Sequence, residues 1–186
     1  MNKTALGIAI ALVALVGILS ALNAYTYGQK QGEGLPQDFK EAVFTITGEP
    51  ISLKDGIAEA KTNLGGDDMT TVRYFGNEVR HDVDGDGAED VVFLVTQETA
   101  AGKVYFYAVG ALKREGGYIG SQAVLLDEDI SPQTTEKGEG RMVIVNYTKR
   151  YGGETQSSIG KSVHLLLDPK DLQFGEVVQN FEGESR

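Results

Sequence analysis

Four aspartates in a short, glycine-containing loop are the residues of this sequence whose types and spacing best suit chemistry. They are Asp82, Asp84, Asp86 and Asp90, at positions 1, 3, 5 and 9 of residues 82–90. Gly87 at position 6 permits a sharp bend, and the backbone carbonyl of Ala88 at position 7 offers a further oxygen. Aspartates spaced in this way can direct their oxygens at one hard cation, and Ca²⁺ takes 6–8 oxygen ligands. The spacing therefore predicts a Ca²⁺ site formed by the four aspartates and Ala88.

The loop has two other interpretations. A helical EF-hand is excluded, because position 12 of that motif must be glutamate and Phe93 stands there. An acidic hairpin turn without metal remains the alternative, since Asp-Gly is itself a strong turn former. Against it, four carboxylates so close together repel one another unless something neutralises them.

The loop and the apolar run that follows it, residues 91–95, together resemble the calcium loops of FG-GAP and VCBS repeats. The resemblance implies that the loop joins two strands and that the ion is structural. Repeat architectures need several copies of their unit, and no second Asp-x-Asp-x-Asp-Gly occurs in the chain. A propeller is therefore not expected.

Composition excludes several classes of function. With 27 acidic against 17 basic residues the net charge is −10, which argues against nucleic acid as a partner. The absence of cysteine removes disulfides, thiol catalysis and a lipid-carrying N-terminal cysteine. With His81 and His164 as the only nitrogen ligands, zinc is not expected either.

The N-terminal residues predict a membrane segment. Residues 5–22 carry no charge, and a helix that crosses a bilayer needs about 17–25 such residues. Poor signal-peptidase sites favour an uncleaved single-pass anchor over a cleaved signal peptide, which would leave the protein secreted. In both cases the remainder lies outside the cytoplasmic membrane. The expected division is residues 1–24 as anchor or signal, 25–37 as a flexible linker, 38–180 as the domain and 181–186 as a disordered tail.

The pattern of the domain favours a mainly β fold: an antiparallel sheet, sandwich-like, or α+β with little helix. Residues 104–112 are apolar at both odd and even positions, which predicts a central strand buried on both faces. Residues 131–140 and 148–160 are polar and are expected to be loops.

A wider resemblance covers about residues 42–170. Segments of this region are similar, as an ordered set, to an uncharacterised family of small secreted or membrane-attached bacterial proteins. The resemblance implies an extracytoplasmic location and supplies no activity or catalytic residue. The segments are residues 73–78, 82–90, 92–97, 117–120, 123–126, 131–136 and 143–147.

Two function hypotheses follow. The first is a non-enzymatic extracytoplasmic domain, structural or binding, stabilised by Ca²⁺ and anchored in the membrane through residues 5–22, with a cell-envelope protein or glycan as partner. The second is a surface hydrolase that acts on cell-wall polymer or glycan through a pair of carboxylates. A pocket with two acids about 5–9.5 Å apart would favour the hydrolase, and a filled core would favour the first hypothesis. No catalytic residue is assigned, and oligomeric state is not readable from the sequence.

Overall fold

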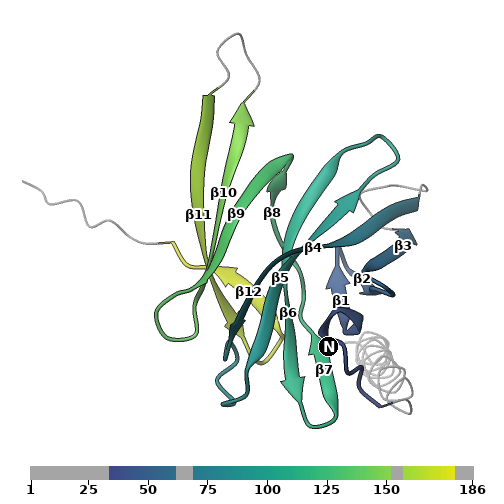
Figure 1. The fold of residues 1–186 in the computed structure, drawn as a ribbon, viewed down its shortest axis with the longest axis vertical. Coiled ribbons are helices and arrows are strands. Elements are labelled where there is room, and N and C mark those ends of the chain that lie inside the picture. Colours follow the sequence, from purple (N-terminus) through teal and green to yellow (C-terminus); the bar gives the residue numbers. More distant parts are fainter. Residues whose placement is uncertain (1–33, 62–68, 152–156, 179–186) are drawn as a thin grey trace, which may run out of the picture. The chain divides into compact units, whose positions relative to one another are not determined.

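A computed structural model describes residues 34–61, 69–151 and 157–178, and in these residues strands dominate and helix is confined to one short 3-10 turn (Figure 1). The strands belong to the unit Pro36–Arg186. In chain order the elements are η1 (Phe39–Glu41), β1 (Val43–Ile46), β2 (Glu49–Ser52), β3 (Ile57–Lys61), β4 (Met69–His81), β5 (Asp90–Glu98), β6 (Val104–Arg114), β7 (Gly117–Gly120), β8 (Val124–Glu128), β9 (Ile130–Lys137), β10 (Val143–Tyr151), β11 (Ser157–Asp168) and β12 (Gln173–Glu176). The expectation of a mainly β, antiparallel fold is confirmed.

The central sheet has the strand order β3-β4-β5-β6-β7. Strand β8 also pairs with β6, along residues 105–108, whereas β7 pairs with residues 111–114. Every pairing between these strands is antiparallel. The register of β4 on β5 shifts around Gly76 and Asn77, where both residues have positive φ, and returns to regular pairing by Val79. This bulge lets β4 run as one long strand from Met69 to His81.

The alternation of side chains in β5 and β6 explains why both strands contain an unbroken run of apolar residues. Val92 and Leu94 face one core cluster, whereas Val91, Phe93 and Val95 face another. In β6, residues 106–112 are buried and divide between the same two clusters. The prediction of a central strand buried on both faces is therefore confirmed.

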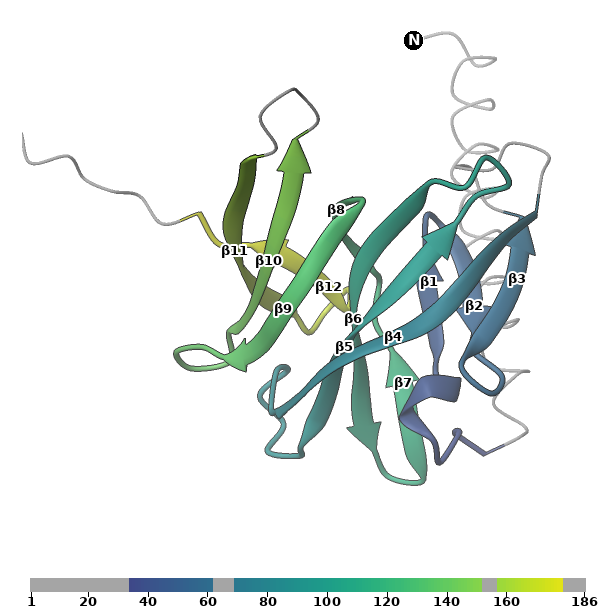
Figure 2. The same cartoon turned by 45° about the horizontal axis from the view of Figure 1, so that its top comes forward.

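A second sheet, with the order β12-β11-β10-β9, covers one face of the central sheet (Figure 2). Its inward side chains join the cluster that contains Leu94 and Phe106. Those side chains are Ile130, Val143, Val145, Tyr147, Leu165, Leu167 and Phe174. Alternating burial along β10 shows that this sheet is apolar on one side and polar on the other.

The opposite face of the central sheet is covered by the β1–β2 hairpin and by η1. The hairpin turns at Thr47 and Gly48, which both have positive φ, as two-residue hairpin turns require. Phe44 from β1 and Phe39 from η1 each make an edge-to-face contact with Phe93 of β5. The molecule is thus layered on both sides of β5 and β6.

Two expectations for polar segments are wrong. Residues 130–137 form strand β9 rather than a loop, and β10 and β11 extend through much of residues 148–160. In β9 only one side needs apolar residues, because the other faces solvent, so a polar sequence with buried Ile130 suffices for pairing with β10. Strand pairing supplied by a neighbouring strand overrides a weak local pattern.

The N-terminal expectations fall largely outside the described residues. Residues 1–24, expected to be an anchor or signal, lie outside them, as do residues 25–33 of the expected linker and the tail 181–186. Within the described ranges, none of the helical structure has the length and apolar character needed to cross a bilayer. At the start of the domain, Tyr118 N–H donates to the Pro36 carbonyl, and Gln37 Nε2 donates to the Gly116 carbonyl.

Candidate metal centre

The aspartate loop connects β4 to β5 across the end of a hairpin. His81 and Asp90 are paired across the two strands, so residues 82–89 form the connection. Gly85 and Gly87 both have positive φ, at +84° and +88°, a conformation that a side chain would strain. The glycine predicted to permit the bend therefore does so, and a second one helps it.

Three of the four predicted carboxylates converge. Asp82, Asp84 and Asp86 each offer a carboxylate oxygen, and these atoms lie within 4.8 Å of one another. The group can hold a metal ion. Its oxygens are hard ligands of the kind that Ca²⁺, Mg²⁺ and Mn²⁺ accept, and neither cysteine nor histidine belongs to it.

Backbone N–H groups of the loop hold the three carboxylates in place. Asp82 accepts from Gly85 N at 2.7 Å and from Gly87 N at 3.0 Å, one to each carboxylate oxygen. Asp84 Oδ1 accepts from Asp86 N at 3.1 Å, and Asp86 Oδ1 accepts from Ala88 N at 2.7 Å. Because aspartate side chains readily bond to backbone two residues ahead, this sequence builds its own turn.

Asp90 does something different from the other three. Its side chain is fully buried, Oδ2 accepts from Val83 N at 3.0 Å, and Oδ1 accepts from Lys113 N at 2.8 Å. Burial raises the pKa of this carboxyl, an effect opposed by those two hydrogen bonds. Asp90 thus ties both ends of the loop to β6, and its role as a metal ligand, like that of the Ala88 carbonyl, stays a prediction.

A cation from β6 already reaches the loop. Arg114 Nη2 lies 2.5 Å from Asp84 Oδ2, and Arg114 Nη1 lies 3.0 Å from Asp86 Oδ2. The Asp84 side chain is only 3% exposed, whereas those of Arg114 and Asp86 are 29% and 41% exposed. Sequence reasoning missed this residue, because 28 positions separate it from Asp86 and no local pattern signals the contact.

The turn between β9 and β10 also touches the loop. His81 Nε2 donates to the Gly140 carbonyl at 2.8 Å, and Arg141 Nη1 donates to the Val83 carbonyl at 3.2 Å. A Cβ on Gly85 would lie 3.1 Å from Arg141 Cδ, so the Arg141 side chain would have to shift slightly to admit it. The loop is thereby fastened to both sheets, and His81 acts in that fastening.

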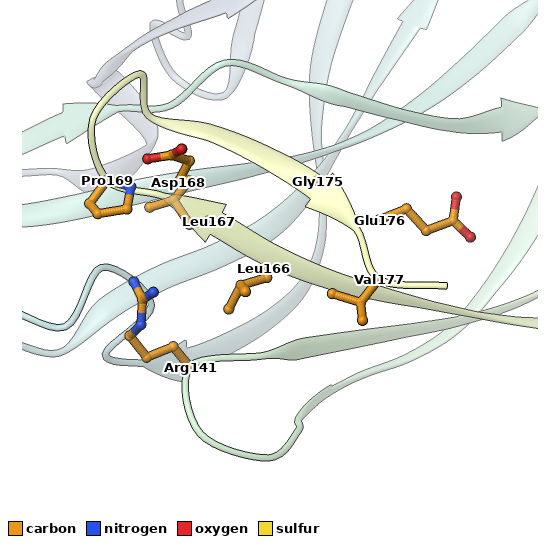
Figure 3. A pocket seen from close by; sticks show the side chains of 8 residues that line it. All are labelled: Arg141, Leu166, Leu167, Asp168, Pro169, Gly175, Glu176 and Val177. Carbon is orange, nitrogen blue, oxygen red and sulfur yellow. The ribbon is translucent and has the colours of Figure 1, made fainter. Parts of the chain in front are cut away.

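An open hollow on the outer side of β11 and β12 is the place to look for a carboxylate pair. It encloses about 390 Å³ and is lined by Arg141, Leu166, Leu167, Asp168, Pro169, Gly175, Glu176 and Val177. Figure 3 shows Asp168 and Glu176 at opposite ends, with their carboxylates directed away from one another. The two acids of this hollow therefore do not form the facing pair that glycoside hydrolysis requires.

Comparison with known proteins supplies no relative from which a role can be transferred: the chain matches no family model, no curated protein and no solved structure.

Proposed function

We propose that this protein is a membrane-anchored, extracytoplasmic structural or binding domain whose aspartate loop is stabilised by Ca²⁺. The observation that carries the proposal is the convergence of Asp82, Asp84 and Asp86 within 4.8 Å. These three would hold the ion, with Asp90 and the carbonyl of Ala88 as further ligands. The ion would neutralise the loop that joins β4 to β5 and so fix the pairing of these strands.

The choice of Ca²⁺ among hard cations follows from the loop's construction. The carboxylates belong to an irregular turn whose backbone N–H groups hold them, and Ca²⁺ tolerates irregular geometry with 6–8 oxygens. Mg²⁺ demands a near-ideal octahedron and gives up its water reluctantly. Zn²⁺ prefers nitrogen and sulfur, and the nearest imidazole, His81, donates through Nε2 to the carbonyl of Gly140.

Thermal unfolding of the full-length chain with Ca²⁺, with Mg²⁺ and with chelator tests the proposal. At about 1 mM Ca²⁺ and a Kd of about 10⁻⁴–10⁻³ M, ligand linkage contributes about 0.4–1.4 kcal/mol. We expect Ca²⁺ to raise the melting temperature by about 1–5 °C, and Mg²⁺ to raise it less. Identical curves in all three conditions would reduce the loop to an acidic turn.

Substitutions in the loop test whether the rise in melting temperature with Ca²⁺ comes from binding at the aspartates. Asp86→Asn and Asp84→Asn should each remove the calcium-dependent part of the shift, because each deletes a charged ligand. Asp84→Asn should also lower the melting point in chelator, since buried Asp84 pairs with Arg114. Asp171→Asn is the matched control, because it removes one exposed charge elsewhere and should leave the calcium response unchanged.

The location is a separate part of the proposal. It is supported by the uncharged stretch at residues 5–22, and a calcium loop suits a compartment in which this ion is plentiful. Full-length protein should fractionate with membranes and resist carbonate washing, and a peptide containing residues 5–22 should be found by mass spectrometry. Recovery of mature protein that begins near Tyr25 would instead show a secreted domain.

The hydrolase alternative gains nothing from the parts of the chain that the structure describes. The acids of the hollow point apart, and the imidazole of His81 donates to the Gly140 carbonyl. We therefore retain the calcium-stabilised domain as the function the geometry supports best.

A further inference from the structure

The last residue of β6 places a positive charge against the aspartate group. Arg114 bridges Asp84 and Asp86 with its two terminal nitrogens, at 2.5 and 3.0 Å. The remaining four oxygens of Asp82, Asp84 and Asp86 accept hydrogen bonds from backbone N–H groups of the loop itself. Arg114 is thus the ion-pair partner that the structure shows for this group.

Arg114 supplies a counter-charge to the aspartate group. Asp84 is buried, and a buried carboxylate without a counter-charge strongly destabilises a fold. A guanidinium fork matches carboxylate oxygens on two neighbouring residues, so it neutralises the two charges and spaces them. The same carboxylates belong to the group that could hold a metal ion, and two cations at one group repel each other.

We infer that Arg114 is a tethered competitor for the metal, one that holds the loop in its metal-free form and sets the calcium affinity. This inference rests on the proposed function. Because Arg114 is covalently part of the chain, its local concentration at the loop is high and constant, and Ca²⁺ must displace it or bind beside it. Both cases weaken Ca²⁺ binding relative to a loop without the arginine.

Backbone contacts make the end of β6 well placed for this role. Lys113 N donates to Asp90 Oδ1, so the residue before Arg114 is already fixed to the last aspartate of the loop. Arg114 Nη1 also donates to the Lys113 carbonyl at 2.7 Å, which orients the guanidinium. The competitor is therefore held in position rather than reaching the loop by chance.

The test is a calcium titration by calorimetry of the full-length chain, as wild type, Arg114→Gln and Arg73→Gln. Arg114→Gln removes the competing charge and should bind Ca²⁺ about tenfold more tightly, which corresponds to about 1.4 kcal/mol. In chelator the same variant should melt at a lower temperature, because Asp84 loses its partner. Arg73→Gln removes an exposed charge from β4 and should match wild type in both measurements.

A second measurement needs no variant and covers the case in which Arg114→Gln does not fold in chelator. In ¹⁵N spectra of wild type, the side-chain Nε–H signal of Arg114 should shift during calcium titration. Its midpoint should equal that of the backbone signals of Gly85 and Gly87. A stationary Arg114 signal beside moving loop signals would overturn the inference.

The outcomes separate the two proposals. If neither wild type nor Arg114→Gln binds Ca²⁺, the proposed function fails and the inference fails with it, and Arg114 is then the permanent counter-ion of a metal-free loop. If wild type binds Ca²⁺ and Arg114→Gln binds it equally or more weakly, the proposed function stands and the competitor role is wrong. Tighter binding by Arg114→Gln with an unchanged Arg73→Gln supports both.

Discussion

The aspartate loop and the strand pair β5–β6 meet at Asp90, yet different kinds of contact hold them. In the loop, Asp82, Asp84 and Asp86 accept hydrogen bonds from backbone N–H groups two to five positions away. In the strand pair, Phe93 packs against Phe39 and Phe44, which lie far away in the sequence. Bound ions should therefore change the stability of the loop, whereas changes of side-chain volume should change the stability of the paired strands.

The largest expected effect tests the strand side of this comparison. Phe93 is fully buried between η1, β1 and β4, so Phe93→Ala should lower the free energy of unfolding by about 3–5 kcal/mol. Denaturant unfolding measures the change. Leu125→Ala is the control, because Leu125 is 52% exposed and its loss should cost less than about 0.5 kcal/mol. Equal effects of both would break the comparison.

Gly120 of β7 lies where the sheet has no room for a larger side chain. A Cβ on Gly120 of β7 would lie 2.3 Å from the Val43 carbonyl oxygen, which is backbone and cannot turn aside. Gly120→Ala should therefore cost about 1–3 kcal/mol or more by overpacking. Gly160→Ala in β11 meets open space and should be neutral or slightly stabilising. Thermal melts of both variants give the contrast.

Asp90 tests where the aspartate loop ends and the buried strand pair begins. It belongs to the loop by sequence but is fully buried and accepts two backbone hydrogen bonds. Asp90→Asn replaces one acceptor by a donor, leaves a buried N–H unpaired and should cost about 1–3 kcal/mol even in chelator. Asp86→Asn, at an exposed side chain, should cost less under the same conditions. A reversed order would place Asp90 with the ion-responsive part of the loop.

The smallest effect concerns a polar atom inside the sheet. Tyr107 is 3% exposed, and its hydroxyl has no hydrogen-bond partner among the residues that the structure describes. Tyr107→Phe should raise the free energy of unfolding at neutral pH by about 1 kcal/mol, since it removes an unsatisfied buried group. A decrease of this size would show that the hydroxyl has a partner.

The same tyrosine gives a pH dependence with a definite sign. Burial raises the pKa of Tyr107 from 10.0 to about 12. Between these values the unfolded chain loses the phenol proton before the folded chain does, so stability falls as pH rises. The slope from this residue is at most about 1.4 kcal/mol per pH unit. Unfolding measured from pH 9 to about pH 12 should show a shallower fall in Tyr107→Phe.

What could be predicted from sequence follows the same division. The turn of the loop was readable because spacing and glycine positions encode contacts between near neighbours, such as Asp82 with Gly87. The central position of β6 was readable because burial on both faces requires apolar residues at every position. Arg114 was not readable, since only the pairing of β5 with β6 brings it to the loop. Strand β9 was missed because its polar residues need only a partner strand.

The segment that leads into η1 has a mechanical consequence. Pro36 and Gln37 are bonded to Tyr118 and Gly116 of the β6–β7 hairpin, which also carries Arg114. Tension applied from the N-terminal side reaches these two bonds before it reaches β1. Under load these two bonds should therefore break first while β5 and β6 stay paired. Pulling from residue 34 in a single-molecule experiment should show a small early extension that calcium changes, because the loaded hairpin is also the one that meets the aspartates.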